Sequence, residues 1–230
     1  MIFKQLFEPL SSTYTYLLGD PQTGQAILID PVIVSMERDL GVLHDLGLTL
    51  AFTLDTHIHA DHITAALALR NATGSKIAAP AFDNLPCADV AIEEGRPFEV
   101  GGISLQPLHT PGHTDGHFSY LLGERVFTGD ALLIDGCGRT DFQSGSAEAL
   151  YDSVTRKLFT LDDHVLVWPG HDYKGQSVSS IGWERKHNAR LANRTRDDFI
   201  ALMAVLDLPR PRMMDIAVPA NRNLGLPHSV

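Results

Sequence analysis

The sequence predicts an α/β fold of two mixed β-sheets that pack face to face, with helices covering their outer sides. Three observations support this prediction. The apolar, strand-like segments come in hairpin-like clusters, single helical segments separate these clusters, and 230 residues is a length that suits one domain. A doubly wound parallel sheet would instead alternate strand and helix throughout, so the clustering favours two layered sheets. We therefore expect residues 1–230 to form a single domain with a short C-terminal helical tail.

The predicted strands are short apolar or alternating runs that are bounded by turn-forming residues. They cover residues 2–8, 13–18, 26–29, 48–54, 76–79, 103–108, 118–122, 125–127 and 165–168. The predicted helices cover residues 35–46, 61–71, 146–159 and 195–207. Ser35 is a typical N-cap for the first of these helices, and Gly47 follows its end. Pro209 ends the last one.

Charge and composition exclude several classes of function. The chain has 28 acidic and 18 basic residues, a formal net charge of -10, which disfavours sequence-independent binding to nucleic acid or to anionic membranes. No apolar run approaches the ~20 residues of a membrane-spanning helix, and the N-terminus lacks the features of a signal peptide. The two cysteines, Cys87 and Cys137, are expected to be free thiols. We expect a cytoplasmic protein, although a mitochondrial matrix protein without its transit peptide would have the same composition.

Histidine is the compositional outlier, with 11 residues, and its densest cluster follows the predicted strand 48–54. His57, His59, Asp61 and His62 place four potential metal ligands within six residues. In extended backbone, residues two apart point the same way, so His57 and His59 can converge on one point. Imidazole and carboxylate ligands suit zinc, iron or manganese, and the lack of cysteine among them disfavours a structural zinc site.

Three further residues follow a glycine at the end of a strand or apolar run: His113, Asp130 and His171. Loops at the C-terminal ends of strands are where α/β folds place their functional sites. These three residues therefore join the cluster at 57–62 as candidate ligands.

At these residues the sequence resembles the metallo-β-lactamase fold superfamily. The Thr-His-Ile-His-Ala-Asp-His run at 56–62, the later Gly-His, Gly-Asp and Pro-Gly-His elements, and their order all match that superfamily. The resemblance implies an αββα four-layer sandwich with a metal at one edge of the two sheets.

Within that superfamily, the chain resembles the persulfide (sulfur) dioxygenases. Thr-Asp-Phe-Gln at 140–143 matches the dioxygenase pattern, where glyoxalase II typically continues with Phe-Glu-Gly. Leu-Ile-Asp-Pro-Val at 28–32 and Met-Asp-Ile-Ala-Val-Pro-Ala-Asn at 214–221 are also similar to the dioxygenases. The short C-terminal part differs from the larger helical one of glyoxalase II. The resemblance spans nearly the whole chain and leans towards a homodimer.

The resemblance implies one Fe(II) per chain, held by His57, His113 and Asp130. Two imidazoles and one carboxylate on one face of an octahedral ion leave three positions open, which suits a non-haem dioxygenase. The other candidate ligands would orient these three or hold a second metal: His59, Asp61, His62 and His171.

The implied reaction converts glutathione persulfide, dioxygen and water to sulfite and glutathione. Glutathione is anionic, so we expect cationic and aromatic contacts from Arg139, Tyr173, Lys174 and Arg222. His117 departs from the family pattern, which has a small or thiol-bearing residue there, and its role stays open.

Two other functions are compatible with the same residues. One is a glyoxalase II-type thioester hydrolase with a binuclear metal site, which would share the glutathione moiety. The other is a metal-binding protein without turnover, such as a sulfur carrier or a sensor partner.

Overall fold

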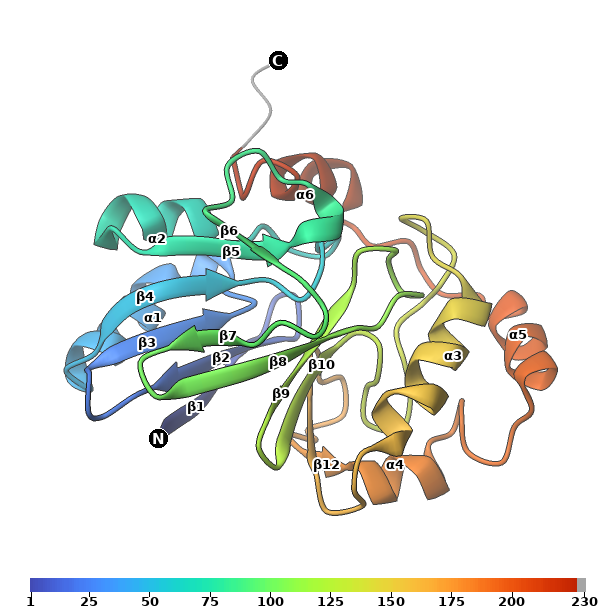
Figure 1. The fold of residues 1–230 in the computed structure, drawn as a ribbon. Helices are drawn as coiled ribbons and strands as arrows, with labels where there is room; N and C mark the ends of the chain where they lie inside the picture. Colours follow the sequence, from blue (N-terminus) through green and yellow to red (C-terminus); the bar gives the residue numbers. More distant parts are fainter. Residues whose placement is uncertain (227–230) are drawn as a thin grey trace. The chain divides into compact units, whose positions relative to one another are not determined.

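The computed structural model describes residues 1–226, which divide into two compact units. Unit 1 contains residues 1–105 and the segment from Arg210 onward, and unit 2 contains residues 106–209. The described residues form two six-stranded sheets (Figure 1). Because the C-terminal segment returns to unit 1, residues near 221 can support residues near 60.

The first sheet has the strand order β1-β2-β3-β4-β5-β6. Strands β1 to β3 pair antiparallel, and β3 to β6 pair parallel. The bounds are β1 Ile2–Glu8, β2 Thr13–Gly19, β3 Gln25–Ile29, β4 Thr49–Leu54, β5 Lys76–Pro80 and β6 Val90–Ile92. The carboxyl ends of the parallel strands β3 and β4 lie side by side, which brings residues 30 and 55–57 together.

The second sheet has the order β12-β11-β10-β9-β8-β7. Only β10 and β11 pair parallel, so this sheet is also mixed. The bounds are β7 Phe98–Val100, β8 Ile103–His109, β9 Phe118–Leu122, β10 Arg125–Gly129, β11 Leu166–Pro169 and β12 Ser179–Ser180. The parallel pair places the residues after Gly129 and after Pro169 at one edge.

Each unit buries its own apolar cluster between a sheet and helices. In unit 1, Leu43 of α1 and Leu69 of α2 pack with Leu17, Leu28 and Leu50 of the first sheet. In unit 2, side chains of α3, α4 and α5 pack with Val126 and Val167. The helices are α1 Met36–Asp45, α2 Ala66–Thr73, α3 Ala147–Arg156, α4 Ile181–His187, α5 Arg196–Ala204 and α6 Met214–Asn221.

The predicted fold class, two mixed sheets with flanking helices, is confirmed, and most predicted strands lie within two residues of their observed bounds. The single-domain expectation stays a prediction. Strands β6, β7 and β12 were not predicted, because two or three residues carry no readable periodicity. Helices α4 and α6 were also missed, and α6 contains Pro219, which the sequence marks as a helix breaker.

Two local predictions were wrong. The helix expected from Asp61 begins only at Ala66, because the backbone of the preceding segment bonds to a distant side chain, as described below. Ser35 does occupy the N-cap of α1, but its side chain makes no capping hydrogen bond, since a 3-10 turn at Ile33–Ser35 leads into the helix. By contrast, the Ser146 hydroxyl caps α3 by accepting the Ala149 amide.

Both cysteines are free thiols, Cys87 exposed and Cys137 buried, as expected. Within residues 1–226, every helix is too short or too polar to cross a lipid bilayer.

Candidate metal centre

Unit 1 contains the histidine segment, which we define as residues 55–65 between β4 and α2. His57, His59 and His62 are all buried. The imidazole of His59 lies between the other two, with ring centroids 4.1 Å from His57 and 4.2 Å from His62. Three rings packed this closely are tolerable when most are neutral, and neutral imidazole is the metal-binding form.

Asp30 organises the start of this segment from the end of β3. One of its carboxylate oxygens accepts the Thr56 amide at 2.7 Å, and the other accepts the Thr56 hydroxyl at 3.0 Å. Because the Thr56 hydroxyl donates to Asp30, it accepts from Nδ1 of His57 at 2.9 Å. His57 therefore carries its proton on Nδ1 and its lone pair on Nε2, the state required of a ligand through Nε2.

The same Asp30 carboxylate also binds His59, but through Nε2 instead of Nδ1. Its Nε2 lies 3.1 Å from Asp30 Oδ1, while its buried Nδ1 has no hydrogen-bond partner among residues 1–226. Burial lowers the pKa of His59, but the carboxylates of Asp30, Asp55 and Asp61 outweigh it and raise the pKa to about 9. At neutral pH both ring nitrogens of metal-free His59 therefore carry protons, so a metal at Nδ1 would have to displace the proton there.

Asp61 and His62 complete the group in unit 1. The His62 Nδ1 lies 2.9 Å from Asp61 Oδ2 and 3.3 Å from the Thr13 hydroxyl of β2. Ligand atoms of His59, Asp61 and His62 lie within 4.8 Å of one another, a separation that a single ion could bridge. Unit 1 therefore brings its four predicted residues together, as the sequence spacing indicated.

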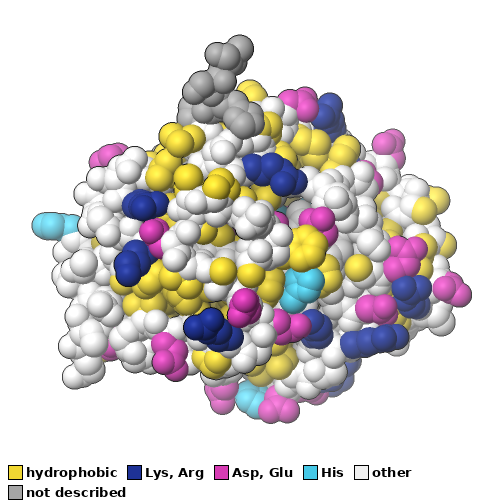
Figure 2. Space-filling view, turned by 45° about the horizontal axis from the view of Figure 1, so that its top comes forward, with side chains coloured by type: hydrophobic (Ala, Val, Ile, Leu, Met, Phe, Trp, Pro, Cys, Tyr) yellow, Lys and Arg dark blue, Asp and Glu magenta, His cyan; other side chains and the backbone are white. Residues whose placement is uncertain are grey.

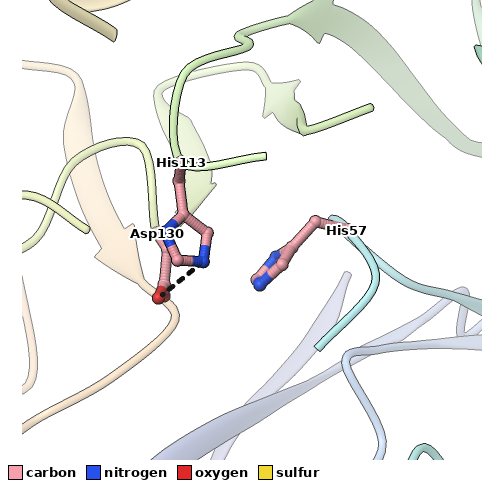
Figure 3. A group of neighbouring side chains, drawn as sticks. All are labelled: His57, His113 and Asp130. Atoms are coloured by element: carbon pink, nitrogen blue, oxygen red, sulfur yellow. Dashed lines mark ion pairs between the residues drawn. The ribbon is translucent and has the colours of Figure 1, made fainter. Parts of the chain in front are cut away.

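In unit 2, His113 and Asp130 form the corresponding group (Figure 3). The Nδ1 of His113 donates to the backbone oxygen of Arg139 at 2.8 Å, which leaves its lone pair on Nε2. That Nε2 lies 3.5 Å from Oδ2 of Asp130. His113 thus adopts the same ligand-ready tautomer as His57, fixed here by a carbonyl instead of a hydroxyl.

Asp130 directly follows β10, and its carboxylate faces two histidines. Oδ2 faces His113, while Oδ1 lies 3.4 Å from Nε2 of His171, which follows β11. Oδ1 is buried and makes no hydrogen bond within the described chain. A buried carboxylate oxygen in this state is costly unless a cation pairs with it, which fits a metal ligand.

His117 is the residue whose role the sequence left open, and it supports Asp130. It is fully buried, and its Nε2 accepts the Asp130 backbone amide at 3.1 Å. Its Nδ1 therefore carries the proton and donates to the Thr110 hydroxyl at 2.9 Å. The sequence signal was its place directly before β9, but no local pattern reveals that the ring reaches the loop after β10.

Two glycines allow these loops to approach so closely. A Cβ on Gly138 would lie 2.5 Å from the Asp130 carbonyl and 2.8 Å from Nδ1 of His113. A Cβ on Gly170 would lie 2.8 Å from Oδ1 of Asp130. Unit 2 therefore brings His113, Asp130 and His171 together by contact between loops that only glycine permits.

The expected substrate contacts occupy different environments. The Arg139 guanidinium binds both carboxylate oxygens of Asp141, at 2.6 and 2.7 Å, and donates to the Pro209 carbonyl at 2.6 Å. Tyr173 is 69% exposed, and its ring stacks on His171 with centroids 5.6 Å apart. Lys174 of unit 2 and Arg222, which follows α6 in unit 1, are both exposed.

Comparison with known proteins identifies the family. Residues 85–171 match the model of the metallo-beta-lactamase superfamily. The chain is 44% identical to the mitochondrial persulfide dioxygenase ETHE1 of Bos taurus and 45% identical to that of Mus musculus, covering 98% of this chain and 89% of each relative. The crystal structure of ETHE1 from Myxococcus xanthus is 56% identical and covers 98% of this chain and all of its own, with a TM-score of 0.97. The chain therefore has the metallo-β-lactamase fold, and it belongs to the persulfide dioxygenase family of that superfamily.

Proposed function

We propose that this protein is a persulfide dioxygenase that converts glutathione persulfide, dioxygen and water to sulfite and glutathione. The observation that carries the proposal is the donor set of the two units. Two imidazoles have Nδ1 committed as a donor and the lone pair on Nε2, and one buried carboxylate has an oxygen without a hydrogen bond. Such a set matches the two-histidine, one-carboxylate pattern of non-haem iron oxygenases.

We propose that one Fe(II) per chain is held by His57 of unit 1 with His113 and Asp130 of unit 2, the side chains drawn in Figure 3. Neutral imidazole and carboxylate are ligands that iron accepts, so the residues fit the metal. When bound, iron supplies the redox chemistry that joins dioxygen to the persulfide sulfur.

The protein's own residues prepare this centre. Asp30, acting through Thr56, and the Arg139 carbonyl hold the two imidazoles in one tautomer and one orientation. His117 fixes the backbone of Asp130. Because these contacts exist before substrate binds, little reorganisation is needed at the centre.

We propose that His59, Asp61, His62 and His171 orient the ligands and bound water. In the binuclear alternative they would hold a second metal instead. The second candidate function is therefore a glyoxalase II-type thioester hydrolase. The observation behind it is that His59, Asp61 and His62 lie close enough together to hold a further metal ion.

For the substrate, we propose contacts from Arg139, Tyr173, Lys174 and Arg222. On the face shown in Figure 2, basic side chains are interspersed with acidic ones, so an anionic thiol would depend on individual cations. Arg139 would bind a glutathione carboxylate in place of the Asp141 carboxylate with which it now pairs. The Asp141 side chain is 52% exposed, so it can turn towards solvent. Tyr173 offers an exposed ring beside His171.

Three broader features also belong to the proposal. We propose a cytoplasmic location, which the two free thiols support, because free thiols persist in reducing compartments. We propose a homodimer, and small-molecule substrates instead of nucleic acid or membrane partners, in line with the net charge of -10.

The test combines metal counting with oxygen uptake on protein purified without air. We expect one iron per chain, oxygen consumption with glutathione persulfide, and sulfite as product. Two zinc ions per chain with fast S-lactoylglutathione hydrolysis and no oxygen uptake would establish the hydrolase instead. Metal binding with neither reaction would favour the carrier or sensor function.

A further inference from the structure

The C-terminal helix α6 ends on a buried amide that bonds to the histidine segment. The Asn221 side chain is 4% exposed, although it lies near the end of the described chain. Its Nδ2 donates to the backbone oxygens of His59 at 2.9 Å and His62 at 2.8 Å. Its Oδ1 accepts the Thr64 amide at 2.9 Å. One side chain thus satisfies three backbone groups across six residues of the segment.

These bonds explain why the segment is not a helix. In a helix, the carbonyl of residue 59 would accept the amide of residue 63, and that of 62 the amide of 66. Here the Ile63 carbonyl accepts the Ile33 amide, and Asn221 takes the carbonyls of His59 and His62. The irregular backbone that lets His57, His59 and His62 face one another is therefore held from outside the segment.

The C-terminal tail, residues 214–226, also packs on this part of unit 1 through contacts that do not involve the Asn221 amide. Leu224 is buried with Ala66 and Ile77, and its carbonyl accepts the Leu67 amide in the first turn of α2 at 3.2 Å. Gly225 packs so closely on the segment that a Cβ would lie 2.4 Å from the Thr64 carbonyl. The tail therefore closes over the segment with both apolar contacts and hydrogen bonds.

We propose that Asn221 is a positioning residue, which sets the metal affinity of the histidine segment by fixing its backbone from His59 to Thr64. It contacts no imidazole atom through the bonds described, so it acts through the main chain. The inference rests on the proposed function only in requiring that a metal binds at this segment.

Two substitutions of Asn221 distinguish the effect of its hydrogen-bond donors from the effect of its size. Asn221→Asp keeps the size and one acceptor for Thr64 but removes both donors, and it places a carboxylate against two carbonyls. Asn221→Ala removes all three bonds. Asn223→Ala is the matched control, because the Asn223 amide donates to the Pro219 carbonyl within the tail. Leu224→Ala is the second control, since it loosens the packing of the tail but keeps the amide.

The measurement is cobalt(II) binding to metal-free protein, followed by its visible absorption and by competition with a chelator. Circular dichroism at low temperature establishes that each variant is folded. We expect Asn221→Asp and Asn221→Ala to lose roughly tenfold or more in cobalt affinity, the range typical of groups that orient ligands. Asn223→Ala and Leu224→Ala should stay within about twofold of the original protein, even if Leu224→Ala unfolds at a lower temperature.

Unchanged cobalt affinity in Asn221→Asp would overturn the proposal, as would an equal loss in Leu224→Ala. If Asn221→Ala does not fold, Asn221→Asp alone decides between these results. The cobalt measurement does not depend on the reaction catalysed. Absence of oxygen uptake by the original protein would therefore contradict the proposed function while leaving this inference to its own test.

Discussion

The two groups of candidate ligands, one in each unit, are built in opposite ways. In unit 1 the ligands are contiguous, and their supports are distant in sequence: Asp30 after β3 and Asn221 in α6. In unit 2 the ligands come from three separate loops, and neighbouring loops support them by direct contact, as Gly138 does against His113. This contrast shows that a group of ligands close together in sequence is easy to recognise, but its backbone needs hydrogen bonds from residues that are distant in sequence. A dispersed site is harder to read but can be held by its own loops.

The strongest test of the comparison removes one carboxylate from unit 2. Asp130→Ala deletes a proposed ligand, so we expect iron retention to be lost and activity to fall by more than about 100-fold. His59→Ala should only weaken both, by about 10–100-fold, because His59 is proposed to orient its neighbours. Iron content after gel filtration and oxygen uptake measure the two variants in parallel. Equal iron loss from both would contradict the assignment of roles.

A second test breaks the distant support of unit 1. Asp30→Asn places an amide where the carboxylate now accepts the Thr56 amide, the Thr56 hydroxyl and His59. We expect metal affinity to fall by about 10–100-fold and the free energy of unfolding to fall by about 2–3 kcal/mol, because a buried charged acceptor with several donors is lost. Cobalt titration and urea unfolding measure the two effects. Unchanged values would show that the segment supports itself.

A third test concerns the close contacts of unit 2. Gly138→Ala forces either the Asp130 carbonyl or the His113 ring to move, so we expect about a tenfold loss of metal affinity. Gly41→Ala is the control, because no atom lies within 4 Å of its Cβ and the residue is inside α1. This control should gain about 0.5–1 kcal/mol in unfolding free energy, with unchanged metal affinity. A tolerated Gly138→Ala would mean that contact between loops does not position the ligands.

The smallest expected effect is on the free energy of unfolding, and it comes from Asp39. This carboxyl is buried like that of Asp30, but it lacks the several hydrogen-bond donors that surround Asp30. Burial raises the pKa of Asp39 to about 6 against the opposing effect of Arg38, and its Oδ2 has no hydrogen bond within residues 1–226. The folded state therefore binds this proton more tightly than the unfolded state, whose pKa is near 3.8. The stabilisation from protonated Asp39 is complete below about pH 4 and is lost as the pH rises through about 6.

Asp39→Asn should accordingly be more stable than the original protein by about 1–2 kcal/mol at pH 8, and the advantage should shrink as the pH falls towards 4. Urea unfolding at pH 4, 6 and 8 measures it. If the difference in unfolding free energy stays constant with pH, Asp39 does not titrate in this range. Burial of its charged carboxylate would then cost less free energy than we expect.

The sequence identified which candidate ligands lie together within each unit, but not the contacts that support them. The dense spacing of His57, His59 and His62 and the glycine before His113 were readable because ligand geometry restricts the local sequence. The roles of Asn221 and His117 were not readable, since each acts on a segment that only the folded chain brings near. The helix expected from Asp61 failed for the same reason: a contact 159 residues away, between Asn221 and His62, overrides local helical periodicity.

The central claim is that His57, His113 and Asp130 share one iron. Anomalous X-ray diffraction at the iron edge, on crystals grown without air, tests it directly. The account predicts one iron peak per chain, bonded to Nε2 of both histidines and to the Asp130 carboxylate. A peak at His59, Asp61 and His62, or two metals per chain, would contradict it.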